Sequence, residues 1–166
     1  MFDIRKATIT DIPTIREMAS IAFPHTYGNI LSPEQIAYMM DWMYSTESLH
    51  KQMTIDGHIF YLAFQHDKPV GYLSIQPEEE HIFHLQKLYI LPNIQGMHLG
   101  TQLFQYAIKA IKEMHPTPCQ MRLNVNRNNS ALLFYEKMGM KKVDEGDFHI
   151  GKGYYMNDYI MGIEIQ

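Results

Sequence analysis

The chain has 166 residues, about the length of one domain, and 46% of them are hydrophobic while 19% are charged. A chain of this size and composition can build a full core without disulfides or a structural metal, and it is too apolar to be intrinsically disordered. The 18 acidic and 14 basic residues give a net charge of −4, too acidic for a dedicated nucleic-acid binder. We therefore expect a single globular domain over residues 1–166, with no nucleic-acid partner.

Cysteine content and hydropathy bear on the compartment. Cys119 is the only cysteine, so no intrachain disulfide can form and nothing points to an oxidising environment. No apolar run approaches the ~18 residues that a membrane span needs, and residues 1–6 lack the apolar run of a signal peptide. We expect a cytoplasmic protein without a membrane partner.

Strand-like and helix-like patterns alternate along the chain without a repeat or a linker, which predicts a mixed α/β unit. Ser32-Pro33-Glu34-Gln35 is the sharpest helix start, because it combines an N-cap serine, a proline at the first helical position and a capping-box glutamine. In the first part of the chain we expect a strand over residues 2–6, a helix from Thr10 or Asp11 to about Phe23, the helix opened by Ser32, and a short helix after Thr46.

The rest of the chain reads as a meander followed by alternating elements. Three apolar or alternating runs over residues 59–64, 70–75 and 82–90 are separated by turn residues and by Pro77, which predicts three antiparallel strands. After them we expect a helix over residues 99–114, a strand over 120–125, a helix over 130–138 that ends at Gly139, and strands over 140–144 and 154–163.

Residues 88–101 form the most informative segment, because they read as a buried strand, a tight loop and a helix start in direct succession. A helix N-terminus offers unpaired N–H groups and partial positive charge, and Gly96 and Gly100 let an anion approach the backbone. The segment lacks the Gly-Lys-Ser/Thr of a P-loop and the GxGxxG of a dinucleotide site. It indicates a phosphate site of another type, while the glycines alone would also suit a plain strand-to-helix connection.

Two motifs resemble those of the GNAT N-acetyltransferases. Gln95, Leu99 and Gly100 match motif A, Gln/Arg-x-x-Gly-x-Gly/Ala after the fourth strand, although His98 replaces the first motif glycine. Residues 128–140 resemble the family's Asn-x-x-Ala-x-x-x-Tyr-Glu-Lys-x-Gly-Phe. The order of elements is similar as well, and the chain shares a weaker resemblance with bacterial polyamine acetyltransferases.

The resemblance implies the GNAT fold: a mostly antiparallel central sheet, with helices on both faces and a splay between strands four and five. It implies acetyl-CoA, with its pyrophosphate on the loop and its pantetheine and acetyl oxygen on free amides of strand four. The cofactor-binding residues implied in this way are Leu88, Tyr89, Ile90, Gln95, Gly96, Met97, His98, Leu99, Gly100, Thr101 and Asn128. Asn128 is also a good helix cap.

Acetyl transfer to an amine needs a base and an acid, because an alkylamine with a pKa near 10.4 is protonated at pH 7. Tyr135 matches the family's tyrosine near the CoA sulfur, where its hydroxyl can donate to the leaving thiolate; outside the motif it would read as a core aromatic residue. His84 lies where several GNAT enzymes carry a glutamate or histidine base. Even spacing puts His84, Gln86 and Leu88 on one strand face. A water chain held by Gln86 or a carboxylate is the alternative base.

Metal chemistry and covalent catalysis lack support in the sequence. His81 and His84 are close in the chain, but no HExxH, paired CxxC or similar ligand set accompanies them. No GxSxG elbow occurs, and Cys119 follows two prolines at the start of an expected strand. We expect no metal cofactor and no serine or cysteine nucleophile.

The resemblance places the acceptor between the first two helices and the far end of the sheet. Tyr27, Tyr38 and Trp42 would there form an aromatic wall for a cation, with Glu34 or Asp41 as the counter-charge. The alternative is that the methionines of this region are core and its charges are solvated.

The expected function is transfer of the acetyl group from acetyl-CoA to the primary amine of a small molecule, in the class of polyamines, by direct attack in a ternary complex. Two alternatives stay open: a GNAT-fold module that binds CoA without transfer, suggested by His98, and acetylation of a protein or peptide amine. We expect a monomer or a homodimer, since the alternating Tyr159, Met161, Ile163 and Ile165 would suit pairing through the last strand.

Overall fold

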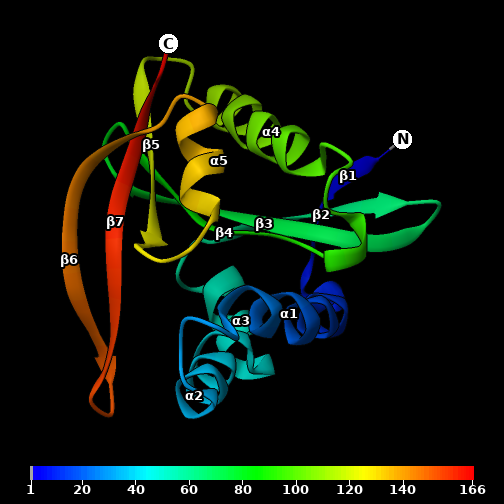
Figure 1. Ribbon diagram of the computed structural model, residues 1–166. Helices are drawn as coiled ribbons and strands as arrows, with labels where there is room; N and C mark the ends of the chain where they lie inside the picture. The colour runs from blue at the N-terminus through cyan, green and yellow to red at the C-terminus, as the bar shows by residue number, and fades with distance from the viewer. Residues whose placement is uncertain (1) are drawn as a thin grey trace.

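A seven-stranded sheet organises the chain, which the computed structural model describes over residues 2–166. Neighbouring strands are antiparallel except β4 and β5, which run parallel (Figure 1). The strand order is β1-β2-β3-β4-β5-β7-β6. The strands are β1 (Asp3–Lys6), β2 (Ile59–Gln65), β3 (Lys68–Glu79), β4 (Ile82–Ile90), β5 (Cys119–Asn126), β6 (Lys141–Gly151) and β7 (Tyr154–Ile165). The predicted mixed α/β class with a mostly antiparallel sheet is confirmed.

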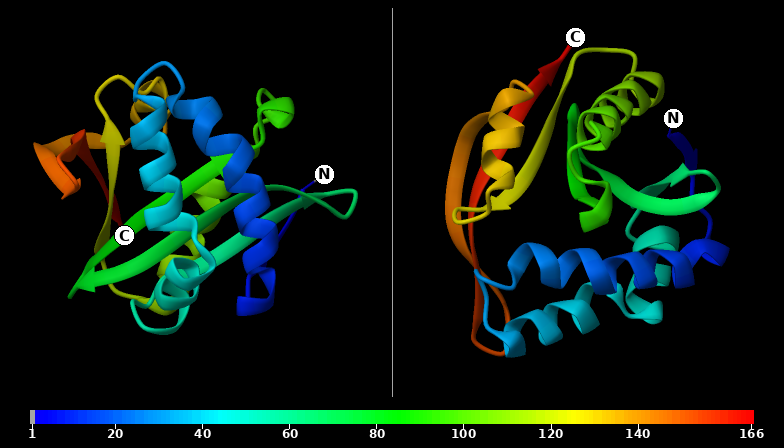
Figure 2. Two further views of the ribbon diagram at one scale, coloured as in Figure 1. Left: turned by 90° about the horizontal axis from the view of Figure 1, so that it is seen from below. Right: turned by 45° about the vertical axis from the view of Figure 1, so that its right-hand side comes forward.

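Helices cover both faces of the sheet, as predicted (Figures 1 and 2). On one face lie α1 (Ile12–Tyr27), α2 (Pro33–Tyr44) and α3 (Thr46–Thr54); on the other lie α4 (Leu99–Met114) and α5 (Ala131–Lys137). Two short 3₁₀ turns, η1 (Ile9–Asp11) and η2 (Pro92–Ile94), complete the elements. Because successive strand residues point to opposite faces, Tyr72 packs under α1 while Leu73 packs in the core under α4.

The last strand contributes to the second of these cores. Tyr159, Met161, Ile163 and Ile165 all pack with the residues buried under α4 and α5, and Met161 and Ile165 are fully buried. Their alternation is therefore explained by the core of the chain itself, and it carries no argument for a dimer.

The helix starts follow the sequence, whereas the end of α1 does not. The Ser32 hydroxyl accepts a hydrogen bond from the Gln35 amide at 3.1 Å and caps α2, as expected. The first helix was expected to end near Phe23 but continues through Pro24 to Tyr27. The rings of Phe23 and Tyr27 are both buried, with their centroids 4.6 Å apart, and this packing stabilises the extra turn despite the proline.

The strands around the hairpin of β6 and β7 are longer than predicted. β6 was expected to end at residue 144 but pairs with β7 as far as Gly151. The tip of this hairpin lies against α2. There the Tyr38 hydroxyl donates to the Ile150 carbonyl at 2.6 Å, and the side-chain amide of Gln35 donates to the Tyr155 carbonyl at 2.8 Å. These long-range bonds stabilise a polar segment whose composition favours a turn. In a similar way, β3 continues through Pro77 to Glu79, with a register shift there.

β4 and β5 separate soon after they meet, which is the splay that the family resemblance implies. The two strands pair at Ile82, Phe83 and His84 of β4 and then diverge, so that residues 85–90 have no partner on β5. The edge of β4 that faces β5 therefore carries free backbone groups in the middle of the sheet.

A bulge in β4 changes the faces on which its side chains lie. Ser74 of β3 pairs with Lys87, while the next residue, Ile75, pairs with Leu85, so Gln86 is the extra residue. Beyond the bulge, Lys87 shares the α1 face with His84, and Leu88 packs in the core under α4. The prediction that His84, Gln86 and Leu88 share one face is therefore wrong for Leu88.

Candidate active site

A cavity of about 590 Å³ occupies the space that opens where β4 and β5 diverge. Its walls are the C-terminal end of α1, residues 85–90 of β4, the loop and first turn of α4, the end of β5, and α5. The cavity therefore reaches both layers of helices, with α4 on one side of the sheet and α1 on the other. A long ligand could pass from one side to the other through the gap.

The N-terminus of α4 has the features of an anion site. His98 occupies the N-cap position with φ 65° and ψ 14°, a left-handed conformation, and its side chain does not cap the helix. The first helical N–H groups, at Leu99, Gly100 and Thr101, have no partner within the helix because of their position. A side chain at Gly100 would press on Ile90 at 3.3 Å and on Phe134, so the glycine keeps the helix close to β4. The helix end thus offers free donors and partial positive charge to the cavity.

Most of the predicted cofactor-binding residues come together around this cavity. Met97 and Asn128 are not part of its lining, and the Met97 side chain is 44% exposed. After Asn128, the next two residues, Asn129 and Ser130, do line it. The predicted residues on the cavity wall are Leu88, Tyr89, Ile90, Gln95, Gly96, His98, Leu99, Gly100 and Thr101.

Tyr135, the predicted acid, lies on α5 and lines the cavity. It is only 8% exposed, and its ring packs against Phe134 and Phe104. Burial raises the pKa of the Tyr135 hydroxyl well above its usual value near 10, so the group stays protonated at neutral pH. It can therefore serve as a hydrogen-bond donor inside the cavity.

His84, the predicted base, is not part of the cavity lining. Gln86, two residues further along β4, is part of that lining. The imidazole Nδ1 is 3.1 Å from Glu78 Oε1. Burial lowers the pKa of His84, and the negative charge of Glu78 opposes that shift. The Gln86 side-chain amide donates to the Gln76 side chain at 2.7 Å, and Gln76 donates to the Asp56 carbonyl at 2.9 Å.

Of the four predicted acceptor residues, Tyr27 lines the cavity and Tyr38, Asp41 and Trp42 do not. The hydroxyls of Tyr27 and Tyr89 are 3.5 Å apart at the boundary of α1 and β4. The ring of Tyr38 stacks on that of Trp42 at 6.4 Å, and its hydroxyl holds the hairpin of β6 and β7.

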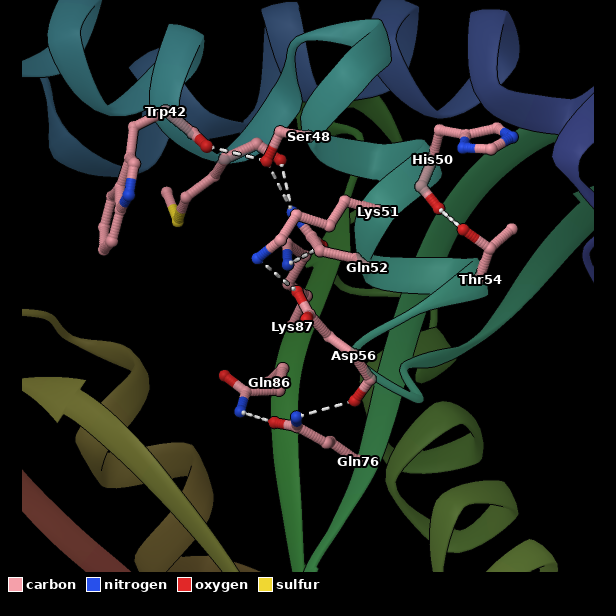
Figure 3. A network of polar contacts seen from close by, with 11 residues as sticks. Trp42, Ser48, His50, Lys51, Gln52, Thr54, Asp56, Gln76, Gln86 and Lys87 are labelled. Atoms are coloured by element: carbon pink, nitrogen blue, oxygen red, sulfur yellow. Dashed lines mark hydrogen bonds and ion pairs between the residues drawn. The ribbon is translucent and has the colours of Figure 1, made fainter.

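Sequence reasoning did not single out Lys87, a charged residue buried beside the site (Figure 3). Its ammonium donates to Gln52 Oε1 at 2.8 Å and lies over the rings of Tyr44 and Phe60 at 5.7 and 5.4 Å. Gln52 in turn donates to the Met43 carbonyl at 2.8 Å and to the Ser48 hydroxyl at 3.0 Å. Burial lowers the pKa of Lys87 to about 7. The bulge in β4 turns this lysine toward α3, and no local pattern signals that.

The opening between two parallel strands beside an uncapped helix end is the arrangement that the resemblance to the acyl-CoA-dependent acetyltransferases implies. The family model of the acetyltransferase (GNAT) domain matches residues 29–153. The chain belongs to this GNAT family and is an acyl-CoA-dependent N-acetyltransferase.

Several individual proteins are similar over the whole chain. Spermidine N(1)-acetyltransferase from Thermoplasma acidophilum is 31% identical over 160 residues, which cover 92% of this chain and 97% of the relative. The solved structure of PaiA N-acetyltransferase from Thermoplasma acidophilum in complex with coenzyme A has a TM-score of 0.80 at 28% identity and covers 98% of both chains. The ribosomal-protein-S18-alanine N-acetyltransferase from Escherichia coli shares the fold, with a TM-score of 0.74 at 16% identity over 100% of this chain and 95% of that one.

Residues 2–166 lack two other kinds of feature. No group of three or more His, Cys, Asp or Glu side chains in this part of the chain is arranged to hold a metal ion. Within the same residues, no helix combines the length and the apolar character needed to cross a membrane.

The buried ammonium of Lys87 predicts a pH dependence of stability. Its pKa is about 7 in the folded chain and 10.5 ordinarily, so between these values the unfolded chain binds one more proton and stability rises with pH. Compared with Lys87→Met, the wild type should gain up to about 1.4 kcal/mol of unfolding free energy per pH unit from pH 7 to pH 10. Urea titrations of both proteins at several pH values measure this difference. Lys112→Met removes an exposed lysine as the control, and a pH-independent difference at Lys87 would contradict the buried charge.

Proposed function

We propose that this acetyltransferase transfers the acetyl group of acetyl-CoA to a primary amine of a small molecule, with polyamines as the first class to test. The divergence of β4 and β5 beside the uncapped end of α4 is the observation that carries the proposal. It supplies free backbone groups and an anion site along one continuous cavity. The likeness to a spermidine N(1)-acetyltransferase over 97% of that relative supports the class of acceptor.

The residues present fit acetyl-CoA, whose thioester would supply an activated acetyl group. The first turn of α4, with Gln95 and Gly96 of the preceding loop, would hold the pyrophosphate. The amides of Leu88 and Ile90 would hold the pantetheine arm and orient the acetyl oxygen, because they point to the open edge. The Leu91 amide, and with it the Tyr89 amide, points to β3 instead. His98 keeps the backbone N–H donor of the motif glycine that it replaces, and its left-handed conformation preserves the shape of the loop.

Acetyl transfer needs a proton donor and a proton acceptor, and Tyr135 and His84 are the side chains proposed for these two roles. The protonated hydroxyl of Tyr135 donates to the sulfur that leaves, because it is buried on the cavity wall and stays neutral. His84 stays neutral at pH 7, since burial lowers its pKa, and it receives the proton of the amine through a water held by Gln86. Tyr27 contributes the aromatic surface for the amine, and Tyr38, Asp41 and Trp42 extend the acceptor region toward the hairpin.

A second class of acceptor is favoured by two more distant relatives. An N-alpha-acetyltransferase from Sulfurisphaera tokodaii is 24% identical over 144 residues, and the peptidyl-lysine N-acetyltransferase YjaB from Escherichia coli is 26% identical over 110 residues. A peptide amine is therefore the alternative substrate.

A turnover screen tests the function directly. Release of free CoA from acetyl-CoA should exceed the background hydrolysis with spermidine or a short diamine. The panel includes amino acids, aminoglycosides, aryl-alkylamines and peptides with free N-termini or lysines. Tight binding of acetyl-CoA without transfer to any of these amines would favour a binding module over an enzyme.

Tyr135→Phe should lower kcat about 10²-fold, because the hydroxyl acts on charge that develops during transfer. The KM for acetyl-CoA should change less than about twofold, since the ring is kept. Steady-state kinetics with the best amine of the screen measure both. Tyr106→Phe, on α4 away from this cavity, is the matched control. An unchanged kcat in Tyr135→Phe would exclude the acid role.

His84 should set the acidic limb of the kcat/KM profile, because activity falls when the imidazole becomes protonated. His84→Ala should remove this limb or depress the rate about 10²-fold. In Glu78→Gln the limb should move to lower pH, because the charge of Glu78 raises the pKa of His84. The profiles are measured from pH 5 to pH 9, with His81→Ala as the control on the adjacent turn. If all the profiles coincide, His84 is structural and water carries the proton.

A further inference from the structure

Asp158 is a buried carboxylate on β7 that the predicted site does not include. In the sheet it pairs with Asn126 of β5 and Gly146 of β6. The neighbouring residue, Tyr159, packs with the core under α4 and α5, so alternation puts Asp158 on the opposite face, which α1 and α2 cover. This is the face to which the cavity extends at the end of α1.

The carboxylate of Asp158 is only half satisfied. The residue is 4% exposed, and its Oδ2 accepts a hydrogen bond from the Asn124 amide at 3.3 Å. Its Oδ1 is buried and has no hydrogen-bond partner among residues 2–166. Burial of a carboxylate oxygen without a donor is costly, so a group from outside the chain is the natural partner for this atom.

The nearby arginine does not fill this role. Arg127 forms an ion pair with Asp147 at 3.0 Å and donates to the Gly146 carbonyl at 3.0 Å. No ion pair joins Asp158 to a cation within the described chain, residues 2–166. Burial raises the pKa of Asp158, and the Asn124 bond and the charge of Arg127 oppose the shift. The carboxylate is thus held without a cationic partner of its own.

Two neighbours connect this carboxylate to the cavity. Asn124, which holds Oδ2, lines the cavity where β5 has separated from β4. Tyr27 lines it from α1; burial raises the pKa of the Tyr27 hydroxyl, and the negative charge of Asp158 adds to this effect. Asp158 is not itself part of the cavity lining, so the half-satisfied carboxylate lies one residue behind the cavity wall, bonded to Asn124, on the other face of the sheet from α4.

We propose that Asp158 anchors a second, non-reacting ammonium group of the acceptor, so that the enzyme selects diamines and polyamines over monoamines. The proposal rests on the proposed function and names the substrate class of its acceptor site. An ammonium brings N–H donors to the free Oδ1 and a positive charge to an unpaired buried carboxylate. The anchored nitrogen differs from the acetylated one, because a carboxylate keeps its bound nitrogen protonated whereas attack needs a free lone pair.

The experiment compares 1,4-diaminobutane with butylamine, which has the same carbon chain and one nitrogen fewer. Turnover of both amines, and their binding to the CoA-saturated protein by calorimetry, are measured for wild type and Asp158→Asn. Asp144→Asn, which changes an exposed carboxylate on β6, is the matched control. Asp158→Asn keeps the side-chain shape and removes a buried charge, so its thermal midpoint should equal or exceed that of the wild type. Asp158→Ser is the second variant if the first does not fold.

In the wild type, the KM or Kd for diaminobutane should be at least tenfold lower than that for butylamine, and Asp158→Asn should abolish this ratio. The KM values for acetyl-CoA and butylamine should change less than twofold. An unchanged ratio in Asp158→Asn, or no preference for the diamine in the wild type, overturns the anchor even if amines are acetylated. Diamine binding that depends on Asp158 without any turnover supports the anchor and refutes the proposed function.

Discussion

The hydrogen bonding between β4 and β5 ends at His84, and the rest of the site depends on this early separation. Two parallel strands that stayed paired would close the sheet and join the two cores without a gap. Their divergence instead leaves residues 85–90 with free backbone groups on one edge. Buried peptide groups need partners, so the open edge is suited to a ligand that offers amides and carbonyls of its own.

The helices on the two faces give the gap two chemically different ends. On one face the uncapped N-terminus of α4 offers donors and partial positive charge, which suits an anion. On the other face Tyr27 offers aromatic surface, and the half-satisfied carboxylate of Asp158 lies behind Asn124 of the cavity wall. Under the proposed function, an anionic acetyl donor and a cationic amine acceptor would approach the same gap from opposite sides.

Two buried charges near the gap, Lys87 and Asp158, lower the stability of the fold. Lys87 lies on β4, which borders the gap, and Asp158 lies on β7, which pairs with the far side of β5. Neither forms an ion pair with an oppositely charged side chain in the described part of the chain. Isolated charges in an apolar interior are unfavourable, so most cores avoid them. Lys87 is partly compensated by Gln52 and two aromatic rings, which ties α3 to the bulged strand.

The amino-acid sequence by itself determined the order of the elements, the helix start at Ser32 and the loop of residues 95–101, because caps, periodicity and glycine positions act within a few residues. Only the tertiary structure decided that α1 continues through Pro24 and that the hairpin of β6 and β7 reaches α2. It also decided the bulge at Gln86 and the neighbours of Asp158. These features arise from pairing and packing between residues far apart in the chain, and local patterns carry no record of such contacts.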